Sequence, residues 1–202
     1  MSEPRLILAS GSRFRRQMLS AAGVAFVSIL PTVDEDTARV AILETTPGIA
    51  PDEMAAALAR VKALSVSAAH PDDWVIGADQ VMALDGRMFS KPVDLAEARM
   101  HVTALSGRTH SLYSAVVLAR GGKIDWHTVA PARMSMRQLT AADIDRYLAR
   151  AGDDVCHTVG AYALEGLGAQ LFDSVEGDYF TIIGLPLLSL LGALRARGQA
   201  GL

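Results

Sequence analysis

The chain has 202 residues, of which 50% are hydrophobic and 20% are charged, and this composition excludes a disordered or fibrous protein. The formal net charge of −3 excludes broad binding to polymeric nucleic acid, because that function needs a basic surface. The single cysteine, Cys156, cannot form an internal disulfide, and the adjacent His157 does not make it a strong nucleophile, because sequence neighbours rarely have triad geometry.

The first half of the sequence predicts strands that alternate with helices. Short apolar runs predict strands at residues 5–9, 25–30, 74–78 and 81–84. Capping signals and an alanine-rich run predict helices at residues 13–22 and 51–69. The stretch from residue 32 to residue 48 is acidic and poorly periodic, and it predicts a loop.

The second half of the sequence predicts a long β-hairpin between two helices, followed by short strands and a further helix. Alternating apolar and polar residues at 110–119 and 126–136 flank Gly121-Gly122, which predicts a β-hairpin. Helices are predicted at residues 92–105 and 141–150, the latter capped by Thr140 with Asp143 three residues on. Short strands are expected after Gly160, and residues 179–194 predict a strand, a turn and a buried helix.

Strands that alternate with helices around a mixed sheet indicate an α/β protein. We expect a mixed twisted sheet flanked by helices, and a single domain over residues 1–202 formed as two lobes around a central cleft. The apolar run at residues 6–9 is too short for a signal peptide, and Gly184 and Pro186 interrupt the most hydrophobic stretch before it reaches the length of a membrane span. We therefore expect a cytoplasmic protein without a membrane partner.

Two polar groups in the first quarter of the chain are suited to phosphate and metal. Ser10, Ser12 and Arg15 follow a predicted strand and open a predicted helix, where N–H groups, hydroxyls and guanidinium groups can form a phosphate cradle. The alternative is a capped amphipathic helix with a solvated basic face. Asp34 and Glu35 supply the oxygen ligands that Mg²⁺ or Mn²⁺ prefers, although acidic loops are also common on soluble proteins.

Two further groups stand at a strand end and before a helix, where α/β folds place ligands. Asp79 ends an apolar strand, and a carboxylate there can activate water directly or through a metal. An ordinary turn aspartate is the alternative. Lys91 precedes a predicted helix N-terminus, against the preference of the helix dipole, which indicates an anion nearby.

The order and spacing of these groups resemble the Maf family from residue 6 to about residue 195. The matching segments are 6–12 with Arg15 and Arg16 after it, 33–35, 77–80, 90–92, 105–110, 177–179 and 184–187. The chain departs from the family at two places. Residues 12–15 read Ser-Arg-Phe-Arg where the family often has Ser-Pro-Arg-Arg, and Ser90 replaces the usual glycine before Lys91.

The resemblance implies a Maf/ITPase-like fold and a homodimeric nucleoside triphosphate pyrophosphatase that uses Mg²⁺, Mn²⁺ or Co²⁺. Its substrate would be an NTP, which it would cleave to the nucleoside monophosphate and pyrophosphate. The family's proton-accepting aspartate corresponds to Asp79. The implied phosphate contacts are Ser10, Arg15, Lys62 and Lys91, and the implied metal ligands are Asp34 or Glu35. Asp178 is a further candidate with a structural turn role as its alternative, and His110 is expected to be structural or adjacent to the substrate.

Three positions separate two branches of the family by substrate. Phe14, Gln80 and Glu165 match the branch that acts on 7-methyl-GTP, with phenylalanine where that branch usually has tryptophan. An aromatic face attracts the cationic 7-methylguanine base, and a carboxylate can accept from its N1–H and N2–H₂ groups. A dTTP or UTP pyrophosphatase of the same family and a non-catalytic nucleotide-binding regulator of cell division remain open. An inosine triphosphate pyrophosphatase is less favoured, because its own motif set is absent.

Overall fold

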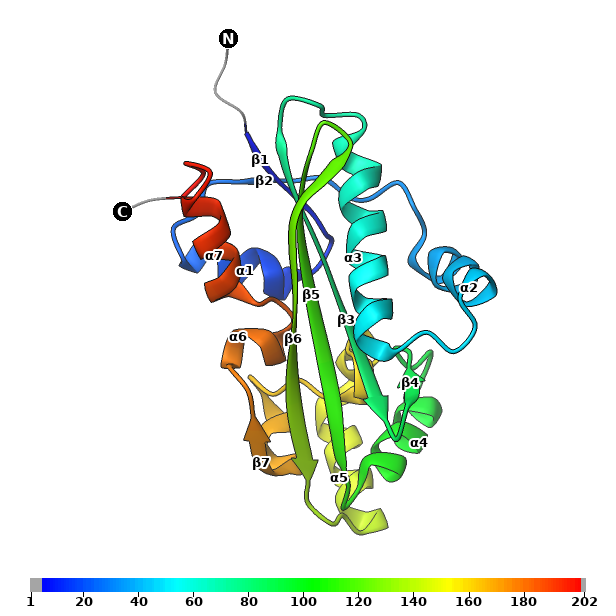
Figure 1. The fold of residues 1–202 in the computed structure, drawn as a ribbon. Coiled ribbons are helices and arrows are strands. Elements are labelled where there is room, and N and C mark those ends of the chain that lie inside the picture. Colours follow the sequence, from blue (N-terminus) through cyan, green and yellow to red (C-terminus); the bar gives the residue numbers. More distant parts are fainter. Residues whose placement is uncertain (1–4, 201–202) are drawn as a thin grey trace. The chain divides into compact units, whose positions relative to one another are not determined.

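A seven-stranded mixed sheet is the framework of the computed structural model, which describes residues 5–200 (Figure 1). Its strand order is β2-β1-β3-β5-β6-β7, and β4 pairs with β3 outside this path. The strands are β1 (Leu6–Ala9), β2 (Val27–Ser28), β3 (Trp74–Leu84), β4 (Arg87–Phe89), β5 (Thr109–Arg120), β6 (Lys123–Met136) and β7 (Phe172–Glu176). Strand β1 pairs in parallel with β2 and β3, whereas β3 with β4 and β6 with β7 are antiparallel.

Seven α-helices within residues 5–200 accompany the sheet, and the predicted α/β class is confirmed. They are α1 (Arg13–Ala21), α2 (Glu35–Thr45), α3 (Pro51–Ser67), α4 (Leu95–Leu105), α5 (Ala141–Ala151), α6 (Tyr179–Ile183) and α7 (Leu187–Arg195). Three 3₁₀-helices follow α5, at η1 (Gly152–His157), η2 (Val159–Ala161) and η3 (Leu167–Leu171). None of these described helices is long and apolar enough to cross a bilayer.

The contacts between residues divide the chain into two compact units. The first unit takes the residues up to Gln80, Tyr113–Ala130 and the residues from Gly184 onward. The second unit takes Val81–Leu112 and Pro131–Ile183. Strands β3, β5 and β6 contribute residues to both units, so the boundary between the units falls within these strands and not in a loop.

The first unit packs helix α3 closely against its parallel strands. All four residues of β1 are buried, as expected for a strand covered on both faces. Helix α3, in cyan in Figure 1, runs beside these strands. At Gly77 of β3 a Cβ atom would lie 2.3 Å from the carbonyl oxygen of Ala59 and 2.7 Å from the nitrogen of Ala63, both in α3. Only glycine therefore allows α3 to lie this close to β3.

The second unit has its own apolar core, to which β3, α4, β5, β6 and α5 all contribute. Met82, Leu105 and Met134 are fully buried within it. The capping box predicted at the start of α5 is confirmed, because Thr140 and Asp143 exchange hydrogen bonds there. The hairpin predicted around Gly121-Gly122 is also confirmed in β5 and β6, and both glycines have positive φ.

The predicted loop from residue 32 to residue 48 was wrong, because helix α2 occupies most of it. Asp34 caps this helix, and Glu35 and Asp36 lie in its first turn, where acidic groups favour the helix dipole. The only buried residue of α2 is Ala38. A helix that buries so little needs no apolar stripe, and for this reason the hydrophobic periodicity did not reveal it.

The predicted strand at the start of residues 179–194 was also wrong, because Tyr179–Ile183 forms helix α6. The side chain of Asp178 accepts a hydrogen bond from the backbone nitrogen of Thr181 at 3.1 Å and thereby stabilises the first turn. Of the short strands expected after Gly160, only β7 forms, and 3₁₀-helices take the rest. The strand predicted at residues 25–30 is reduced to Val27–Ser28.

Candidate active site

Asp79 is a buried carboxylate of strand β3, with 3% of its surface exposed. Its Oδ1 accepts a hydrogen bond from Nζ of Lys62 at 2.5 Å. Its Oδ2 is also buried, and no residue between 5 and 200 donates a hydrogen bond to it. Oδ1 of this carboxylate is therefore hydrogen-bonded, whereas Oδ2 can accept a hydrogen bond from a further donor.

The close packing of α3 on β3 brings Lys62 to Asp79. Gly77 and Asp79 are two residues apart in the strand and therefore face the same side of the sheet. Ala63, which contacts Gly77, directly follows Lys62 in α3. The absence of a side chain at Gly77 thus allows the lysine, only 9% exposed itself, to reach a buried carboxylate.

Lys62 is held from a second side by Glu35. Its Nζ lies 2.7 Å from Oε2 of Glu35, the first residue of α2. Helix α2 packs against α3, and this contact places the glutamate beside the lysine. One ammonium group therefore bridges two carboxylates, which fixes all three side chains in a partly buried site.

Asp34 does not join this group, although the sequence analysis paired it with Glu35. The side chain of Asp34 is exposed, and its Oδ1 accepts hydrogen bonds from the backbone nitrogen of Thr37 at 2.8 Å and from the Thr37 hydroxyl at 2.9 Å. These hydrogen bonds lower the pKa of Asp34. Its position is explained by the capping of α2, whereas Glu35 lies in the site.

The electrostatic setting makes Asp79 a stronger base than an ordinary aspartate. Burial raises the pKa of Asp79, and the nearby charge of Glu35 raises it further. The positive charges of Lys62 and Arg15 act in the opposite direction without cancelling the effect of burial. A raised pKa brings a carboxylate closer to the value that general base catalysis near neutral pH requires.

Arg15 is buried in the first unit, and its guanidinium group is bonded mainly to the protein. Its Nε donates to the carbonyl of Gly184 at 2.9 Å, and Nη1 donates to the carbonyl of Ala78 at 2.9 Å and to Oγ of Ser10 at 3.3 Å. Burial lowers the pKa of Arg15, and Asp79 and Glu35 raise it in turn. Within residues 5–200, Nη2 is the one guanidinium nitrogen of Arg15 without a hydrogen-bonded acceptor.

Ser10 connects this arginine to the start of α1. Its Oγ also accepts a hydrogen bond from the backbone nitrogen of Ser12 at 3.2 Å, and Ser12 caps α1. The hydroxyl of Ser10 is 4% exposed, so it is pre-positioned beside Arg15 rather than solvated. The sequence predicted that Ser10 and Arg15 act together, and the structure brings them together with Asp79 and Lys62.

Two of the three predicted specificity residues lie in the first unit. Phe14 is half-buried in α1, and the guanidinium carbon of Arg13 lies 4.7 Å from the centre of its ring. This distance is within the range of a cation–π contact. Gln80 directly follows Asp79, and its Nε2 donates to Oγ of Ser114 at 2.9 Å. Ser114 fixes the orientation of the Gln80 amide.

Three predicted residues belong to the second unit. Lys91 and Glu165 are both exposed there. Asp178 is also exposed, and its carboxylate bonds to the backbone nitrogen and the hydroxyl of Thr181, which is the structural turn role considered for it. The structure therefore groups Ser10, Arg15, Lys62, Asp79 and Glu35 in one unit, and Lys91 and Glu165 in the other.

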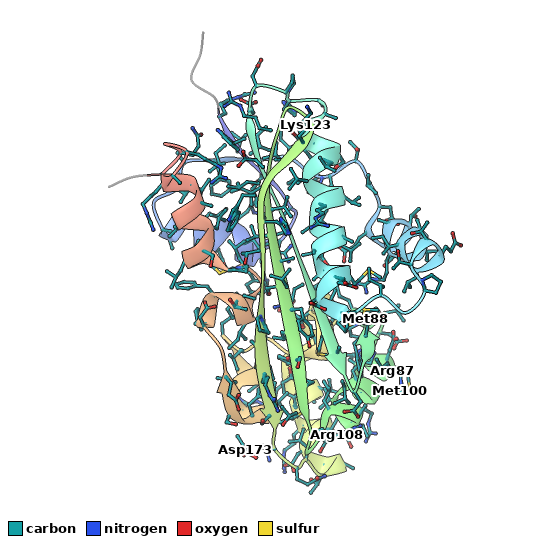
Figure 2. The ribbon with its side chains drawn as sticks, in the orientation of Figure 1. Arg87, Met88, Met100, Arg108, Lys123 and Asp173 are labelled. Carbon is teal, nitrogen blue, oxygen red and sulfur yellow. The ribbon has the colours of Figure 1, made fainter. Side chains whose placement is uncertain are left out.

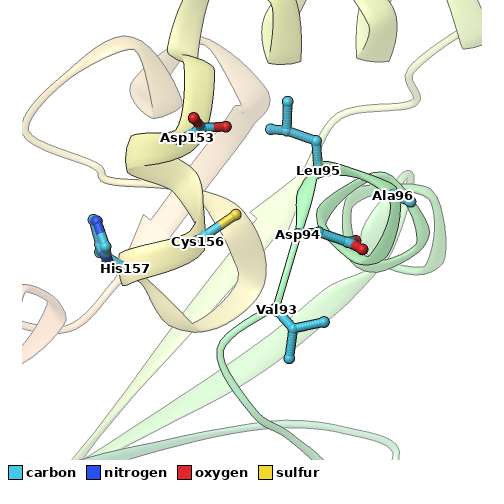
Figure 3. Close-up of a pocket in the computed structure, with 7 residues that line it drawn as sticks. All are labelled: Val93, Asp94, Leu95, Ala96, Asp153, Cys156 and His157. Atoms are coloured by element: carbon cyan, nitrogen blue, oxygen red, sulfur yellow. The ribbon is translucent and has the colours of Figure 1, made fainter.

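The pocket drawn in Figure 3 belongs to the second unit and has no phosphate-binding character. It has a volume of about 500 Å³, and Val93, Asp94, Leu95, Ala96, Asp153, Cys156 and His157 line it. Burial and the charges of Asp153 and Asp94 raise the pKa of the Cys156 thiol. Acidic neighbours repel phosphate and suppress the thiolate, so this pocket supplies neither a phosphate site nor an activated nucleophile.

The residues of the site fit a divalent cation that is shared with a phosphate ligand. Mg²⁺ is usually bound by one or two carboxylates, with waters and substrate phosphates as its other ligands. Glu35 offers a carboxylate beside Asp79, because both are bonded to Nζ of Lys62. No group of three or more His, Cys, Asp or Glu side chains between residues 5 and 200 is arranged to hold a metal by itself.

Sequence reasoning missed the groups that orient the site from a distance. Ser114 is fully buried in β5 and holds Gln80, and the carbonyl of Gly184 accepts from Arg15 across 169 residues of sequence. The Gly-Leu-Pro segment was noted as a motif, but nothing in its residue types indicated that its first carbonyl would be an arginine acceptor.

Comparisons with known proteins agree with these observations. The family model described as Maf-like protein matches residues 5–197. The chain is 49% identical over 195 residues to the 7-methyl-GTP pyrophosphatase of Rhizobium etli, covering 96% of this chain and 97% of that protein. It is 47% identical over 198 residues to the nucleoside triphosphate pyrophosphatase of Caulobacter vibrioides, covering 98% of each. A solved nucleoside-triphosphatase (dITP/XTP pyrophosphatase) from Mycobacterium abscessus has a TM-score of 0.43 and 15% identity, covering 96% of this chain and 95% of that one.

Proposed function

Because the chain belongs to the family of Maf-like proteins, we propose that it is a nucleoside triphosphate pyrophosphatase, which hydrolyses an NTP to the nucleoside monophosphate and pyrophosphate. The buried pair of Lys62 and Asp79, with Oδ2 of Asp79 open, carries this proposal. A buried carboxylate with a raised pKa and a free oxygen is suited to take a proton from water.

The reaction needs one proton transfer and one displacement at phosphorus. Asp79 takes the proton of the attacking water at Oδ2, while Lys62 holds Oδ1 and keeps the carboxylate in place. The water oxygen forms a bond to the α-phosphorus, and the bond from that phosphorus to the bridging oxygen of the β-phosphate breaks. Pyrophosphate leaves with the electron pair, and no covalent enzyme intermediate is required.

Positive charge and hydroxyl groups bind the triphosphate in this proposal. Ser10 and Nη2 of Arg15 supply donors beside Asp79, and Lys62 supplies charge at the carboxylate itself. The family resemblance adds Lys91 as a further point charge for the triphosphate. Such donors stabilise charge that develops in the transition state more than charge in the ground state.

A divalent cation, Mg²⁺, Mn²⁺ or Co²⁺, would be held by Glu35, and when bound it would neutralise charge on the triphosphate. Asp34 is the weaker candidate for this role, because one of its oxygens already caps α2. The family resemblance also supports a cytoplasmic homodimer, and both are parts of the proposal.

We propose 7-methyl-GTP as the preferred substrate. Phe14 offers an aromatic face that already accepts a guanidinium group, and 7-methylguanine is likewise cationic. Glu165 offers a carboxylate for the guanine N1–H and N2–H₂ groups, and Gln80 offers an amide beside Asp79. One similar relative is named a 7-methyl-GTP pyrophosphatase and another a nucleoside triphosphate pyrophosphatase, so the names of the relatives do not decide the substrate. The proposal of 7-methyl-GTP therefore rests on these three side chains.

A screen of purified protein against canonical and modified NTPs tests the proposal. Each reaction contains Mg²⁺, Mn²⁺ or Co²⁺ and an auxiliary inorganic pyrophosphatase, and released phosphate is measured colorimetrically. We expect phosphate release that depends on the auxiliary enzyme and is fastest with 7-methyl-GTP. Release from no NTP with any of the metals would favour a non-catalytic nucleotide-binding regulator, and fastest release from dTTP or UTP would favour the pyrimidine branch.

A further inference from the structure

A buried hydrogen bond joins His110 and Tyr162 in the core of the second unit. Nε2 of His110 lies 2.6 Å from the hydroxyl oxygen of Tyr162, and the two residues are 1% and 5% exposed. Phe172 packs against both rings, with its centre 4.8 Å from that of Tyr162 and 5.9 Å from that of His110. This cluster holds Tyr162, three residues before Glu165, in one orientation.

A second tyrosine bonds to the backbone that leads to Glu165, and this backbone has an unusual conformation that its surroundings must enforce. Tyr147 donates a hydrogen bond from its hydroxyl to the carbonyl of Ala161 at 2.9 Å. Ala161 has a φ of 60°, a left-handed conformation that a residue with a side chain adopts only when its surroundings enforce it. The preceding Gly160 has a φ of 81°, and a Cβ there would lie 2.7 Å from the sulfur of Met82.

The backbone that follows Glu165 is equally constrained. A Cβ at Gly168 would lie 2.5 Å from the carbonyl oxygen of Ala163, so only glycine permits this return of the chain. Gly166 donates from its backbone nitrogen to the same carbonyl at 3.2 Å. Glu165 is therefore an exposed carboxylate on a short segment whose two ends are both held in place.

The His110–Tyr162 hydrogen bond uses only one of the two ring nitrogens of His110. Nδ1 of His110 is buried, and no residue between 5 and 200 bonds to it. A polar atom left without a partner in a core costs stability, and two apolar side chains of similar shape would avoid that cost. A polar pair that holds the backbone beside an exposed carboxylate is suited to a preorganised recognition site.

We propose that His110 and Tyr162 are positioning residues for base selection, because their hydrogen bond holds the segment that presents Glu165 to the guanine edge. This inference rests on the proposed function and extends it to two residues that do not touch the substrate. A carboxylate on a fixed backbone binds the base with a smaller loss of conformational freedom than a carboxylate on a mobile segment. Tyr147 supports the same segment through Ala161.

The test compares Tyr162→Phe with the double variant His110→Leu/Tyr162→Phe and with Ile144→Val. The first removes only the hydroxyl, and the second also removes the histidine that would be left without a partner. Ile144 is buried in α5 in the same core, so its variant controls for loss of packing alone. The readout is the ratio of kcat/KM for 7-methyl-GTP to kcat/KM for dTTP, measured with the melting temperature.

Tyr162→Phe should lower this ratio by about fivefold or more, through a higher KM for 7-methyl-GTP, while dTTP hydrolysis changes by less than about twofold. The double variant should regain melting temperature without regaining the ratio. Ile144→Val should lower the melting temperature and leave the ratio unchanged. An unchanged ratio in both tyrosine variants, with normal dTTP hydrolysis, would overturn this inference alone. A wild-type protein that hydrolyses neither nucleotide would overturn the proposed function as well.

Discussion

Nζ of Lys62 lies 2.5 Å from Oδ1 of Asp79, and Oδ2 of the same carboxylate is buried without a donor among residues 5–200. The lysine stabilises the ionised form of Asp79, while burial and Glu35 oppose it. The balance leaves a carboxylate whose pKa is raised and whose free oxygen can accept a proton.

Asp79→Asn should lower turnover by about 10²-fold or more, because the amide cannot accept the proton of the attacking water. The melting temperature should not fall. A raised pKa means that the stability contribution of the protonated carboxyl is lost as pH rises through that pKa, so the ionised group is unfavourable at pH 7. Asp52→Asn is the matched control, because Asp52 is exposed at the start of α3. Steady-state kinetics and calorimetry check both points, and wild-type turnover in Asp79→Asn would remove this residue from the mechanism.

Arg15→Ala and Lys91→Ala should both slow turnover, on the order of 30-fold to 10³-fold, since each removes charge from the triphosphate site. The two variants should differ in their free energy of unfolding. Arg15 donates to Gly184, Ala78 and Ser10, so its loss should cost on the order of 3 kcal/mol in the free energy of unfolding. Lys91 is exposed, and its loss should cost less than about 0.5 kcal/mol.

Lys123→Ala is the control for this pair of variants. Lys123 is exposed at the start of β6, where Figure 2 labels it. Its removal changes the net charge as Lys91→Ala does, and it should leave kcat/KM unaltered. Urea unfolding and kinetics with 7-methyl-GTP measure both quantities. Equal kinetics in Lys91→Ala and Lys123→Ala would place Lys91 outside the site.

The sequence predicted the chemistry of the site better than its supporting contacts. Ser10 and Arg15 follow the end of β1 and open α1, and a local pattern of that kind can be read without a structure. The strand end predicted at Asp79 was wrong, because β3 continues through this residue to Leu84. The acceptors of Arg15 could not be predicted, since Gly184 lies 169 residues away and contributes only a carbonyl. Lys62 was identified through the family resemblance, because nothing in an alanine-rich helix marks one lysine as the partner of a buried aspartate.

The errors in the fold have a common physical cause. Helix α2 buries only Ala38, so it has little apolar periodicity, and its acidic N-terminus looked like a metal-binding loop. Helix α6 has five residues, too few for a helical period to be distinguished from an apolar strand. In both cases a capping aspartate was the available signal. Asp34 was interpreted as a metal ligand, and Asp178 was left open between a functional role and a structural turn role.

The triple variant Phe14→Arg, Gln80→Thr, Glu165→Gln should move substrate preference from 7-methyl-GTP toward dTTP and UTP. The arginine removes the aromatic face, and the glutamine cannot accept from both guanine donors as a carboxylate does. We expect the ratio of kcat/KM values for 7-methyl-GTP and dTTP to fall by about 10²-fold, with dTTP hydrolysis retained. A wild-type preference for dTTP or UTP of about tenfold or more would contradict the substrate assignment and leave the pyrophosphatase assignment intact.

His110 should make the protein less stable in mild acid. Burial lowers its pKa from 6.5 to about 4, so the unfolded state binds a proton more readily than the folded state between these values. The stability that the neutral imidazole contributes is complete above pH 6.5 and is lost as pH falls toward 4. Between pH 7 and pH 5 the wild type should lose roughly 2 kcal/mol more than His110→Leu/Tyr162→Phe in urea unfolding. Parallel losses in both proteins would mean that His110 accepts a proton in the folded state.

The most direct test of the central claim is to hydrolyse 7-methyl-GTP in isotopically labelled water and to locate the heavy oxygen by mass spectrometry. Attack by water on the α-phosphorus, with Asp79 as the base, predicts one labelled oxygen in 7-methyl-GMP, unlabelled pyrophosphate and equal amounts of the two products. With Asp79→Asn the same products should form about 10²-fold more slowly. Label in pyrophosphate, or release of a nucleoside diphosphate and orthophosphate, would contradict the mechanism.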